Sequence, residues 1–481
     1  MPYGQSYEEY RKTYEDVVKA KNKLKAVDLV NTLSYDEEEQ ALEIMKDYAV
    51  LNNHGSIKII DTTKQGLTIS SMGELKTLFA NQELLCLDKV SGKMKMVNPV
   101  DIWMKSKKRK EFYGTKFNPS SSTNDESYNL FKGFNHEAKD LGDITLFKSF
   151  VREVLCSGEE LMFNIVWTFL AQMVQDPTRK MGTALVLLSA KGTGKSSFLH
   201  VLGKLLEGYF MQTAENKRLL GEFNNHLSST LLFYANELTF TDNKRVVSKL
   251  KNVITETSFT YELKGGATYT DPNYTRIIID SNEDTVVVQT ADERRFIYPV
   301  ISESKIGDTE YFNKLYTSFE EDGFYESLMH DLMNFNYSDW EKYLKTPPKN
   351  EVTQEQMLES FSNIDSWWLY CLEESRIPHA NYTVAHDGTL SITHDEMYKS
   401  IKKYTLENGA RMNGMTMLVF IDNFKKHILK DLDMNIVHRP NGEGIRPRYR
   451  IYAPLNKQVE HFKKIKHLNS IDYDGTEWIT A

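Results

Sequence analysis

A glycine-containing segment in the middle of the chain has the residue types and spacing that phosphate binding requires. Residues 189–196 read SAKGTGKS and follow an apolar run, residues 184–188, that is typical of a buried parallel strand. Glycines let the backbone curl so that its N–H groups point at phosphate oxygens, while the lysine reaches the β- and γ-phosphates and the final serine ligates Mg²⁺. The sequence therefore predicts a site for ATP and Mg²⁺. Its residues are Ala190, Lys191, Gly192, Thr193, Gly194, Lys195, Ser196 and Ser197.

One position of this segment departs from the pattern G-x-x-x-x-G-K-[ST]. Ser189 stands where the first glycine is expected. That glycine mainly eases the turn out of the strand, so a small serine is a tolerable replacement. A chance glycine turn is the alternative, but the apolar strand before it and the helical spacing of residues 197–202 favour a phosphate-binding loop.

The composition is typical of a soluble enzyme with several domains. The 481 residues suffice for about three domains. No run of about 18 apolar residues predicts a membrane span, and the first residues lack the basic start and apolar core of a secretory signal. We therefore expect a cytoplasmic protein that is not secreted and has no membrane partner. The three cysteines lie far apart without a C-x-x-C pair, which argues against a disulfide framework or a zinc ribbon.

A second apolar strand, residues 230–235, ends in Asn236 and Glu237. ATPases of this architecture need a carboxylate at the tip of the strand beside the phosphate loop, where it polarises the attacking water and helps to hold the Mg²⁺ shell. Glu237 is the predicted base. Glu237 and Ser196 are also the residues predicted to hold the Mg²⁺ that is bound with ATP. Asn236 replaces the usual Asp and is a neutral second ligand. A surface glutamate after a strand is the alternative.

A third apolar strand, residues 276–280, is followed by Ser281 and Asn282. An amide at that strand end can sense the γ-phosphate and orient the water. The segment DERRF follows at residues 292–296, and its adjacent Arg294 and Arg295 suggest a guanidinium aimed at phosphate. A plain salt-bridge pair is the alternative for these arginines. The predicted catalytic set is therefore Glu237, Asn282, Arg294 and Arg295.

Taken in this order, the motifs resemble those of the superfamily 3 helicases, which are ring-forming AAA+ ATPases of DNA viruses, phages and mobile elements. The match is strongest to the helicase part of phage and poxvirus-type primase–helicases and covers about residues 95–375. SAKGTGKSS resembles the phosphate loop, LLFYANE the Walker B strand, LKNVITETSFTYELKGG the B′ motif, IIIDSN sensor 1 and DERRF the arginine-finger segment. The resemblance implies that Arg294, more than Arg295, acts on ATP bound by the neighbouring subunit.

The B′ segment also predicts a shape of its own. Residues 259–263 alternate like a strand, Lys264 and Gly265 begin a turn, and residues 268–270 return, which indicates a β-hairpin. In the resembling family this hairpin projects into the ring channel and its lysine holds the nucleic-acid backbone. A lysine on phosphate binds any sequence, as translocation requires. Lys264 and Gly265 are thus predicted DNA contacts, and a merely exposed hairpin lysine is the alternative.

The C-terminal part has the order of a winged helix. Pro347 and Pro348 indicate a linker, and Thr393 with Glu396 predicts a capping box that starts a helix over residues 397–407. A second helix over residues 416–432 and a basic β-hairpin follow. Residues 421–467 hold eleven Lys and Arg against five Asp and Glu within a chain of net charge −8. This local excess favours nucleic-acid contact, through Arg446 and Arg448, over a solvated face.

The predicted fold class is α/β, with an AAA+ P-loop domain, an N-terminal α+β accessory region and a C-terminal winged helix. The predicted divisions are an accessory or collar region at 1–140, a helical segment at 141–180, the superfamily 3 ATPase domain at 181–345 and a nucleic-acid-binding region at 346–481.

The resulting hypothesis is an ATP-dependent replicative DNA helicase of a phage or mobile element that works as a ring, a homo-hexamer, on single-stranded and forked DNA. A primase or polymerase is a further expected partner. Two alternatives stay open. One is a DNA-dependent ATPase that loads or remodels replication proteins without unwinding, and the other is a P-loop kinase of small molecules. Strand displacement on a forked duplex separates the first alternative from a helicase, and stimulation of hydrolysis by nucleic acid separates both from the kinase.

Overall fold

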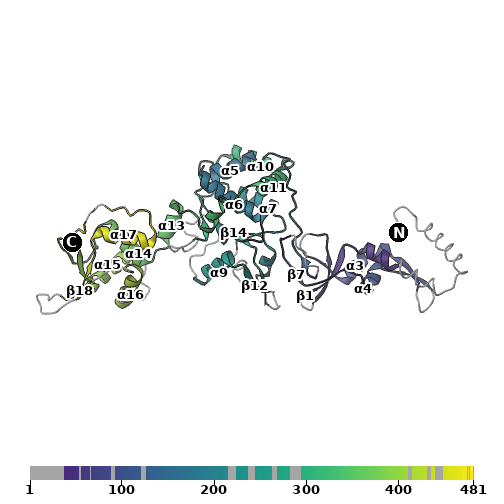
Figure 1. Ribbon diagram of the computed structural model, residues 1–481, viewed down its shortest axis with the longest axis horizontal. Helices are drawn as coiled ribbons and strands as arrows, with labels where there is room; N and C mark the ends of the chain where they lie inside the picture. Colours follow the sequence, from purple (N-terminus) through teal and green to yellow (C-terminus); the bar gives the residue numbers. More distant parts are fainter. Residues whose placement is uncertain are drawn as a thin grey trace.

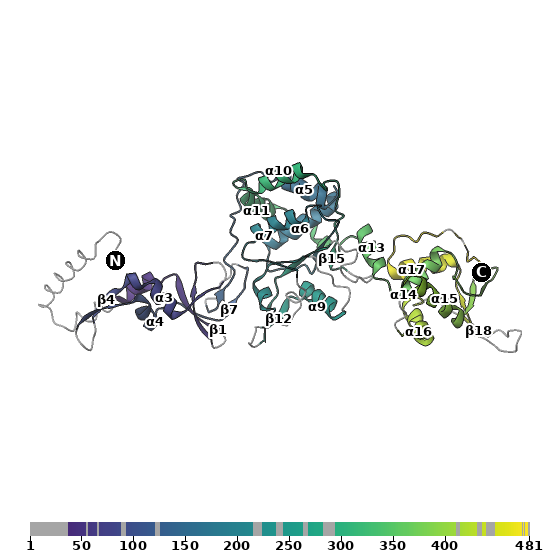
Figure 2. The same ribbon diagram turned by 180° about the vertical axis from the view of Figure 1, so that it is seen from behind.

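The computed structural model arranges the chain as three lobes in a row, and both views show the same order (Figures 1 and 2). The N-terminal lobe holds β1 to β8, the central lobe α5 to α13, and the C-terminal lobe α14 to α17. The structure describes residues 37–53, 56–64, 67–87, 93–120, 126–214, 224–236, 244–262, 268–281, 294–409, 414–430, 435–438, 448–473, 475 and 477–479. None of the described helices combines the length and hydrophobicity that crossing a bilayer requires.

The N-terminal lobe is a small α+β unit that lies within the predicted α+β accessory region. Its four-stranded sheet has the order β3-β2-β1-β6, and β1 pairs antiparallel with β2 and parallel with β6. A buried cluster around Trp103, Val100 and Leu75 packs two short helices on this sheet. The elements are β1 (Tyr48–Asn53), β2 (Ser56–Asp61), β3 (Thr68–Ser70), α3 (Met72–Leu78), η1 (Ala80–Gln82), β4 (Leu84–Leu87), β5 (Met94–Val97), α4 (Pro99–Lys105), β6 (Glu111–Tyr113), β7 (Thr115–Lys116) and β8 (Tyr128–Asn129).

A five-stranded parallel sheet with the order β10-β11-β14-β9-β15 forms the centre of the central lobe. Its strands are near-continuous apolar runs because helices or a hairpin cover both faces. The strands are β9 (Ala184–Leu188), β10 (Phe210–Thr213), β11 (Leu232–Asn236), β14 (Arg276–Ser281) and β15 (Phe296–Ile297). The bounds of β9, β11 and β14 agree with the three predicted strands to within two residues.

In this sheet β14 lies between β9 and β11 and pairs in parallel with both. The chain leaves β11, forms α9 and a hairpin on one face, and returns through β14, so the later strand takes the place next to β9.

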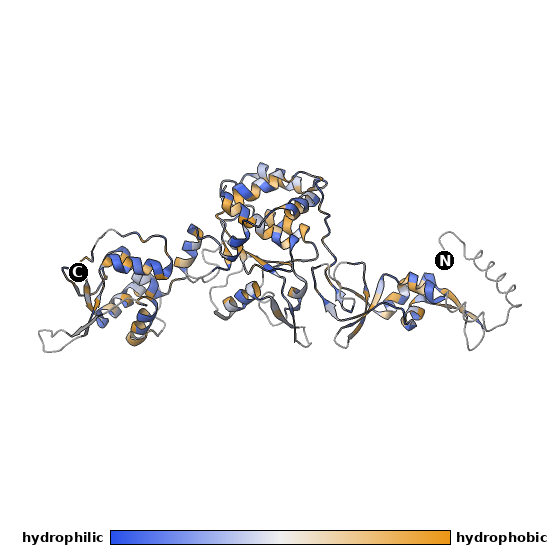
Figure 3. Cartoon of the chain, viewed as in Figure 1, coloured by the Kyte–Doolittle hydropathy of each residue, from blue (hydrophilic) through white to orange (hydrophobic). Residues whose placement is uncertain are grey.

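Different elements pack on the two faces of the central sheet (Figure 1). Leu185, Leu187 and Ile278 face the helices α5, α6, α7, α10 and α11, whereas Val186, Ile277 and their neighbours face α9 and the hairpin. Helix α6 is buried along Met162–Val174 and is among the most hydrophobic helices of this lobe (Figure 3). The covering elements are α5 (Thr145–Phe150), the π-helical η2 (Val151–Leu155), α6 (Glu160–Gln175), α7 (Lys195–Leu205), η3 (Asn225–Ser229), α9 (Lys244–Thr255), β12 (Ser258–Glu262), β13 (Thr268–Pro272), α10 (Thr309–Phe319), α11 (Phe324–Asn334), α12 (Glu341–Lys345) and α13 (Glu351–Glu359).

The C-terminal lobe has its own core, built around Trp367 and Trp368. Its four-stranded antiparallel sheet has the order β16-β17-β19-β18, and β18 with β19 forms the hairpin that the sequence predicts. The elements are α14 (Asn363–Glu373), β16 (Tyr382–Val384), β17 (Leu390–Thr393), α15 (His394–Glu407), α16 (Met417–His427), β18 (Asn435–His438), β19 (Arg448–Tyr452) and α17 (Leu455–Lys466).

Two details of the predicted helices in this lobe are wrong. The second helix, α16, ends at His427 and not at residue 432. The capping box is only half formed. The Thr393 hydroxyl accepts from the Glu396 N–H at 3.3 Å, as expected, but the Glu396 carboxylate accepts from the N–H of Asn381 at 2.6 Å. The carboxylate therefore ties α15 to the segment before β16, a partner that local spacing cannot reveal.

Candidate functional site

The loop between β9 and α7, residues 189–194, is the centre of the candidate site, and we call it the glycine loop. Gly192 and Gly194 have φ values of +89° and +95°, which L side chains rarely adopt. A Cβ on Gly194 would also lie 2.7 Å from a Phe150 ring atom and 2.9 Å from a Phe312 ring atom. Glycine at position 194 is thus required both by the backbone and by the rings packed against it.

Lys195 is the first residue of α7, and its side chain folds back over the glycine loop. The residue is only 6% exposed. Its Nζ donates to the Ser189 carbonyl at 2.7 Å, to the Ser189 hydroxyl at 3.0 Å and to the Ala190 carbonyl at 3.3 Å. The Ser189 hydroxyl also lies 2.7 Å from Thr193 Oγ1. Ser189, the one departure from the sequence pattern, therefore fastens both the lysine and the loop.

A cavity of about 540 Å³ opens beside the glycine loop. It lies where the carboxyl ends of the parallel strands meet the start of α7, the place where α/β sheets bind ligands. Backbone N–H groups of the loop, the positive end of the helix and the Lys195 amine together suit an anionic group. The residues that line it are Lys191, Gly192, Thr193, Gly194, Lys195, Ser196, Ser197, Asn236, Asp280, Phe312 and Tyr316.

The ends of β11 and β14 add two polar side chains to this cavity. Asn236 and Asp280 are register partners, so they lie side by side in the sheet. The Tyr234 hydroxyl donates to Asn236 Oδ1 at 3.2 Å and orients that amide. Asp280 is a site residue that the sequence reasoning missed, although a carboxylate ending the run RIII was a visible signal.

Some of the predicted site residues lie outside the described residues. These are Glu237, Asn282, Lys264, Gly265 and Arg446. Of the predicted nucleotide-binding set, Ala190 belongs to the glycine loop without lining the cavity, and the structure brings the other predicted members from Lys191 to Ser197 together with Asn236.

Arg294 and Arg295 do not lie at this cavity. The Arg295 carbonyl accepts from the N–H of Ala184 at 2.7 Å, at the start of β9, whereas the glycine loop follows the end of β9. Four steps of about 3.3 Å place the two ends of that strand about 13 Å apart. Arg294 is exposed and Arg295 is half-buried. The arginine pair therefore lies near the start of β9, whereas the glycine loop of the same chain follows the end of that strand.

The hairpin β12–β13 is formed, with Tyr261 opposite Tyr269 in its register. The Asn224 side chain anchors it, because Nδ2 donates to the Thr260 carbonyl at 3.1 Å and Oδ1 accepts from the Glu262 N–H at 2.8 Å. The sequence reasoning missed this anchoring role. Asn224 thus fixes the direction in which the hairpin leaves the sheet.

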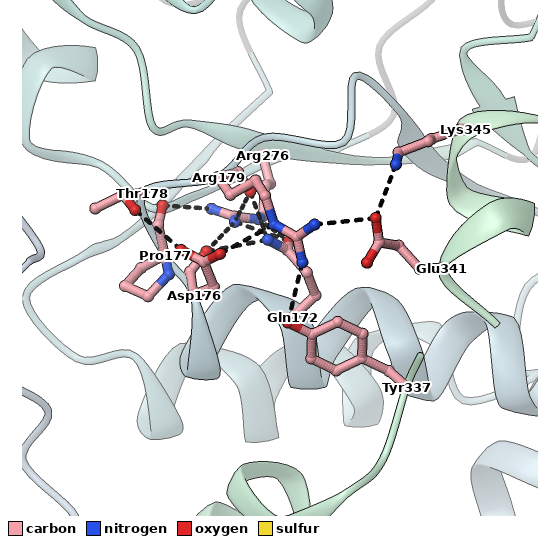
Figure 4. A network of polar contacts seen from close by, with 9 residues as sticks. All are labelled: Gln172, Asp176, Pro177, Thr178, Arg179, Arg276, Tyr337, Glu341 and Lys345. Carbon is pink, nitrogen blue, oxygen red and sulfur yellow. Dashed lines mark hydrogen bonds and ion pairs between the residues drawn. The ribbon is translucent and has the colours of Figure 1, made fainter. Parts of the chain in front are cut away.

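A buried arginine at the start of β14 joins the sheet to the end of α6 (Figure 4). The Arg276 guanidinium donates to Gln172 Oε1 at 2.9 Å and to the carbonyls of Arg179 at 2.9 Å and Pro177 at 3.2 Å. Burial lowers the pKa of Arg276 to about 10, so the side chain is still charged at neutral pH. This network fixes the connection from α6 to β9, and so supports the strand that carries the glycine loop.

Replacing Arg276 with alanine is expected to lower the free energy of unfolding by about 3–5 kcal/mol, because several buried acceptors lose their donor at once. Urea unfolding measures the effect. Arg179→Ala is the matched control, since Arg179 lies in the same network but is 42% exposed and pairs with Glu341 at the surface at 3.0 Å. The control should cost about 1 kcal/mol or less. Equal losses in the two variants would contradict a supporting role for Arg276.

The hairpin of the C-terminal lobe carries a buried arginine beside a histidine. Arg448 is the first residue of β19 and pairs with His438 in the register. Arg450 is buried, and its Nε donates to His394 Nε2 at 3.0 Å. Burial and the nearby charges of Arg450 and Lys425 lower the pKa of His394 to about 4. His394 is therefore neutral at pH 7 and acts as an acceptor that holds β19 against α15.

Comparisons with known proteins agree with this architecture. A family model described as a family of unknown function (DUF5906) matches residues 187–295, a span from β9 to Arg295 that contains the glycine loop and the hairpin. The chain is 26% identical over 149 residues to the DNA primase-polymerase of Nitratiruptor phage NrS-1. That alignment covers 29% of this chain and 21% of the phage protein, about a fifth of its length.

Solved structures extend the likeness over most of the chain. An apo structure of the NrS-1 C-terminal region has a TM-score of 0.58 at 15% identity, and a second has a TM-score of 0.57 at 16% identity. Each match covers 86% of this chain and 98% of the other. The chain is thus similar in fold to the C-terminal region of NrS-1 and, over a shorter stretch, similar in sequence to the primase-polymerase of that phage.

Proposed function

We propose that this chain is an ATP-dependent DNA helicase of phage replication, with a superfamily 3 AAA+ ATPase as its central lobe and a winged helix as its C-terminal lobe. The likeness to a phage DNA primase-polymerase supports a role in phage replication. The motif order and the parallel sheet support the ATPase assignment. ATP binds in the cavity beside the glycine loop, and hydrolysis drives movement along single-stranded DNA.

The observation that carries this proposal is the conformation of the glycine loop. Two left-handed glycines and a buried Lys195 form an anion-binding turn at the start of α7, at the carboxyl edge of a parallel sheet. The amine now bonded to the Ser189 and Ala190 carbonyls is the cation that phosphate oxygens attract. The Ser196 hydroxyl, with Glu237 as its partner, would hold Mg²⁺, which supplies charge neutralisation at the γ-phosphate.

The arginine pair supports an assembly in which ATP lies between subunits. Among the described residues that line the cavity, the only cations are Lys191 and Lys195. A further guanidinium would stabilise the transition state of phosphoryl transfer. Arg294 of the same chain cannot supply it, because it lies near the start of β9 and not at the end that leads into the glycine loop. A neighbouring copy in a ring, a hexamer by resemblance, supplies that residue.

Two carboxylates compete for the role of base in hydrolysis. Glu237→Gln is expected to bind ATP but to hydrolyse it about 10²- to 10⁴-fold more slowly, because an amide cannot accept the proton. Asp280→Asn is the matched variant, since Asp280 is the described carboxylate that lines the cavity. Steady-state hydrolysis with nucleotide-binding titrations measures both. A larger loss of turnover in Asp280→Asn than in Glu237→Gln would transfer the role of base to Asp280.

The test of the proposed function is unwinding of a forked duplex together with ATPase activity measured with and without single-stranded DNA. The parent should displace a strand and should hydrolyse ATP faster on DNA. Lys264→Ala should keep basal hydrolysis but lose both the stimulation and the unwinding, because a hairpin lysine contacts the nucleic-acid backbone and not the nucleotide.

Lys249→Ala, a change to an exposed lysine of helix α9 beside the hairpin, is the control and should unwind like the parent. If the parent shows DNA-stimulated hydrolysis without strand displacement, the protein is a loading or remodelling ATPase. A rate of hydrolysis that does not change when DNA is added would contradict both the helicase and the loading or remodelling ATPase.

A further inference from the structure

Helix α10 presents an aromatic surface to the cavity beside the glycine loop. Phe312 and Tyr316 lie one turn apart on this helix, and both line the cavity. Phe312 packs against Gly194, as its close approach to that position indicates. The polar loop and this aromatic surface therefore face the same volume.

Two large hydrophobic side chains near the glycine loop are exposed. Tyr316 is 43% exposed and Ile306 is 44% exposed. Ile306 Cγ2 lies 3.7 Å from the place where a Cβ on Gly192 would be, so this side chain adjoins the glycine loop. Exposed hydrophobic side chains that flank an anion-binding loop suit a ligand with both a charged part and an apolar part.

Tyr316 is fixed in place, as a stacking platform must be. Its hydroxyl accepts from the Ser197 hydroxyl at 2.9 Å, which ties the ring to the first turn of α7. Its ring meets the edge of Phe319 at a centroid distance of 5.7 Å. The ring is therefore held from two sides while a large part of the residue is open to solvent.

The positions of the two serines after Lys195 indicate where each end of the nucleotide lies. Successive residues of a helix point about 100° apart, so Ser196 and Ser197 face different sides of α7. Ser196 also lines a second cavity with Tyr234 and Asn236 of β11, whereas Ser197 is bonded to Tyr316. The terminal phosphate thus belongs on the Ser196 and Asn236 side, and the other end of the nucleotide belongs on the Tyr316 side.

We propose that Tyr316 forms the subsite for the nucleobase of the bound triphosphate and stacks on the face of the base. The inference rests on the proposed function, because it places the base of the nucleotide whose phosphates occupy the glycine loop. Stacking recognises the face that every base has, and not its edge. The site therefore accepts more than one nucleoside triphosphate.

The experiment compares ATP with inorganic tripolyphosphate, which has the phosphates but no base. In Tyr316→Ala, the KM for ATP should rise on the order of tenfold, because one stacking contact is lost. The kcat should fall less than about threefold, since the ring does not contact the phosphates. The inhibition constant of tripolyphosphate should stay within about twofold of the parent, because it makes no contact with the ring. Tyr316→Phe keeps the ring but loses the bond to Ser197 that helps to hold it, so its KM should lie between those of the parent and of Tyr316→Ala.

Lys314→Ala is the control on the same helix. The Lys314 amine pairs with Glu310 at 2.7 Å at the surface and does not line the cavity, so both constants should keep their parental values. An unchanged KM in Tyr316→Ala, or equal weakening of ATP and tripolyphosphate, would overturn the base subsite. A parent protein that binds tripolyphosphate and hydrolyses no nucleotide would instead overturn the proposed function, so the two failures are distinguishable.

Discussion

Lys195→Ala is expected to abolish ATP hydrolysis, with a loss of about 10³-fold or more, because it removes the cation that we propose faces the β- and γ-phosphates. The lysine is buried and contributes three hydrogen bonds to the glycine loop. Its removal therefore also leaves carbonyl oxygens of the loop without their donor. Phosphate release from ATP measures turnover, and binding of a labelled nucleotide measures affinity.

Two controls accompany this variant. Lys314→Ala removes an exposed lysine of α10 that pairs with Glu310 at 2.7 Å, and it should hydrolyse ATP like the parent. Urea unfolding of Lys195→Ala should give a folded protein that has lost about 1–3 kcal/mol. Turnover near the parental value in the folded variant would contradict the assignment of the glycine loop.

The second large effect is expected when two inactive variants are mixed. Arg294→Ala alone should hydrolyse ATP on the order of 10³-fold more slowly or worse, because that is the rate enhancement that a guanidinium contributes at the transition state. If Arg294 acts on the neighbouring subunit, a Lys195→Ala subunit beside an Arg294→Ala subunit completes one interface that has both residues. Mixing the two proteins should therefore restore part of the hydrolysis.

Native mass spectrometry of the mixture checks that both variants enter the same assembly. Arg295→Ala is the comparison for Arg294→Ala, since Arg295 is half-buried beside β9 whereas Arg294 is exposed. Absence of any recovery in rings of proven mixed composition would count against a role between subunits.

The local elements of the central lobe could be predicted because their signals are local. The apolar runs at β9, β11 and β14 and the alternation at β12 give strands within a few residues of the observed bounds. The conformation of the glycine loop follows from two glycines and a lysine at fixed spacing. The pairing order of the strands could not be predicted in this way, because it depends on which crossover covers which face of the sheet.

The missed residues are those whose partners are distant in sequence. Asp280 joins the cavity only because β14 lies beside β9, and Arg276 meets Gln172 across 104 positions of sequence. Tyr316 reaches Ser197 across 119 positions. A residue type and its immediate neighbours do not specify such contacts, whereas the fold does.

Strand β9 has a consequence for how neighbouring sites communicate. Its start is bonded to the backbone of Arg295, and its end leads directly into the glycine loop. Within the proposed ring, this short strand would therefore connect the phosphates of a subunit's own nucleotide with the arginine that it offers to the next subunit. We therefore expect a shift of the loop on hydrolysis to be felt at the adjacent site of the ring, so that the sites would turn over in sequence and not independently.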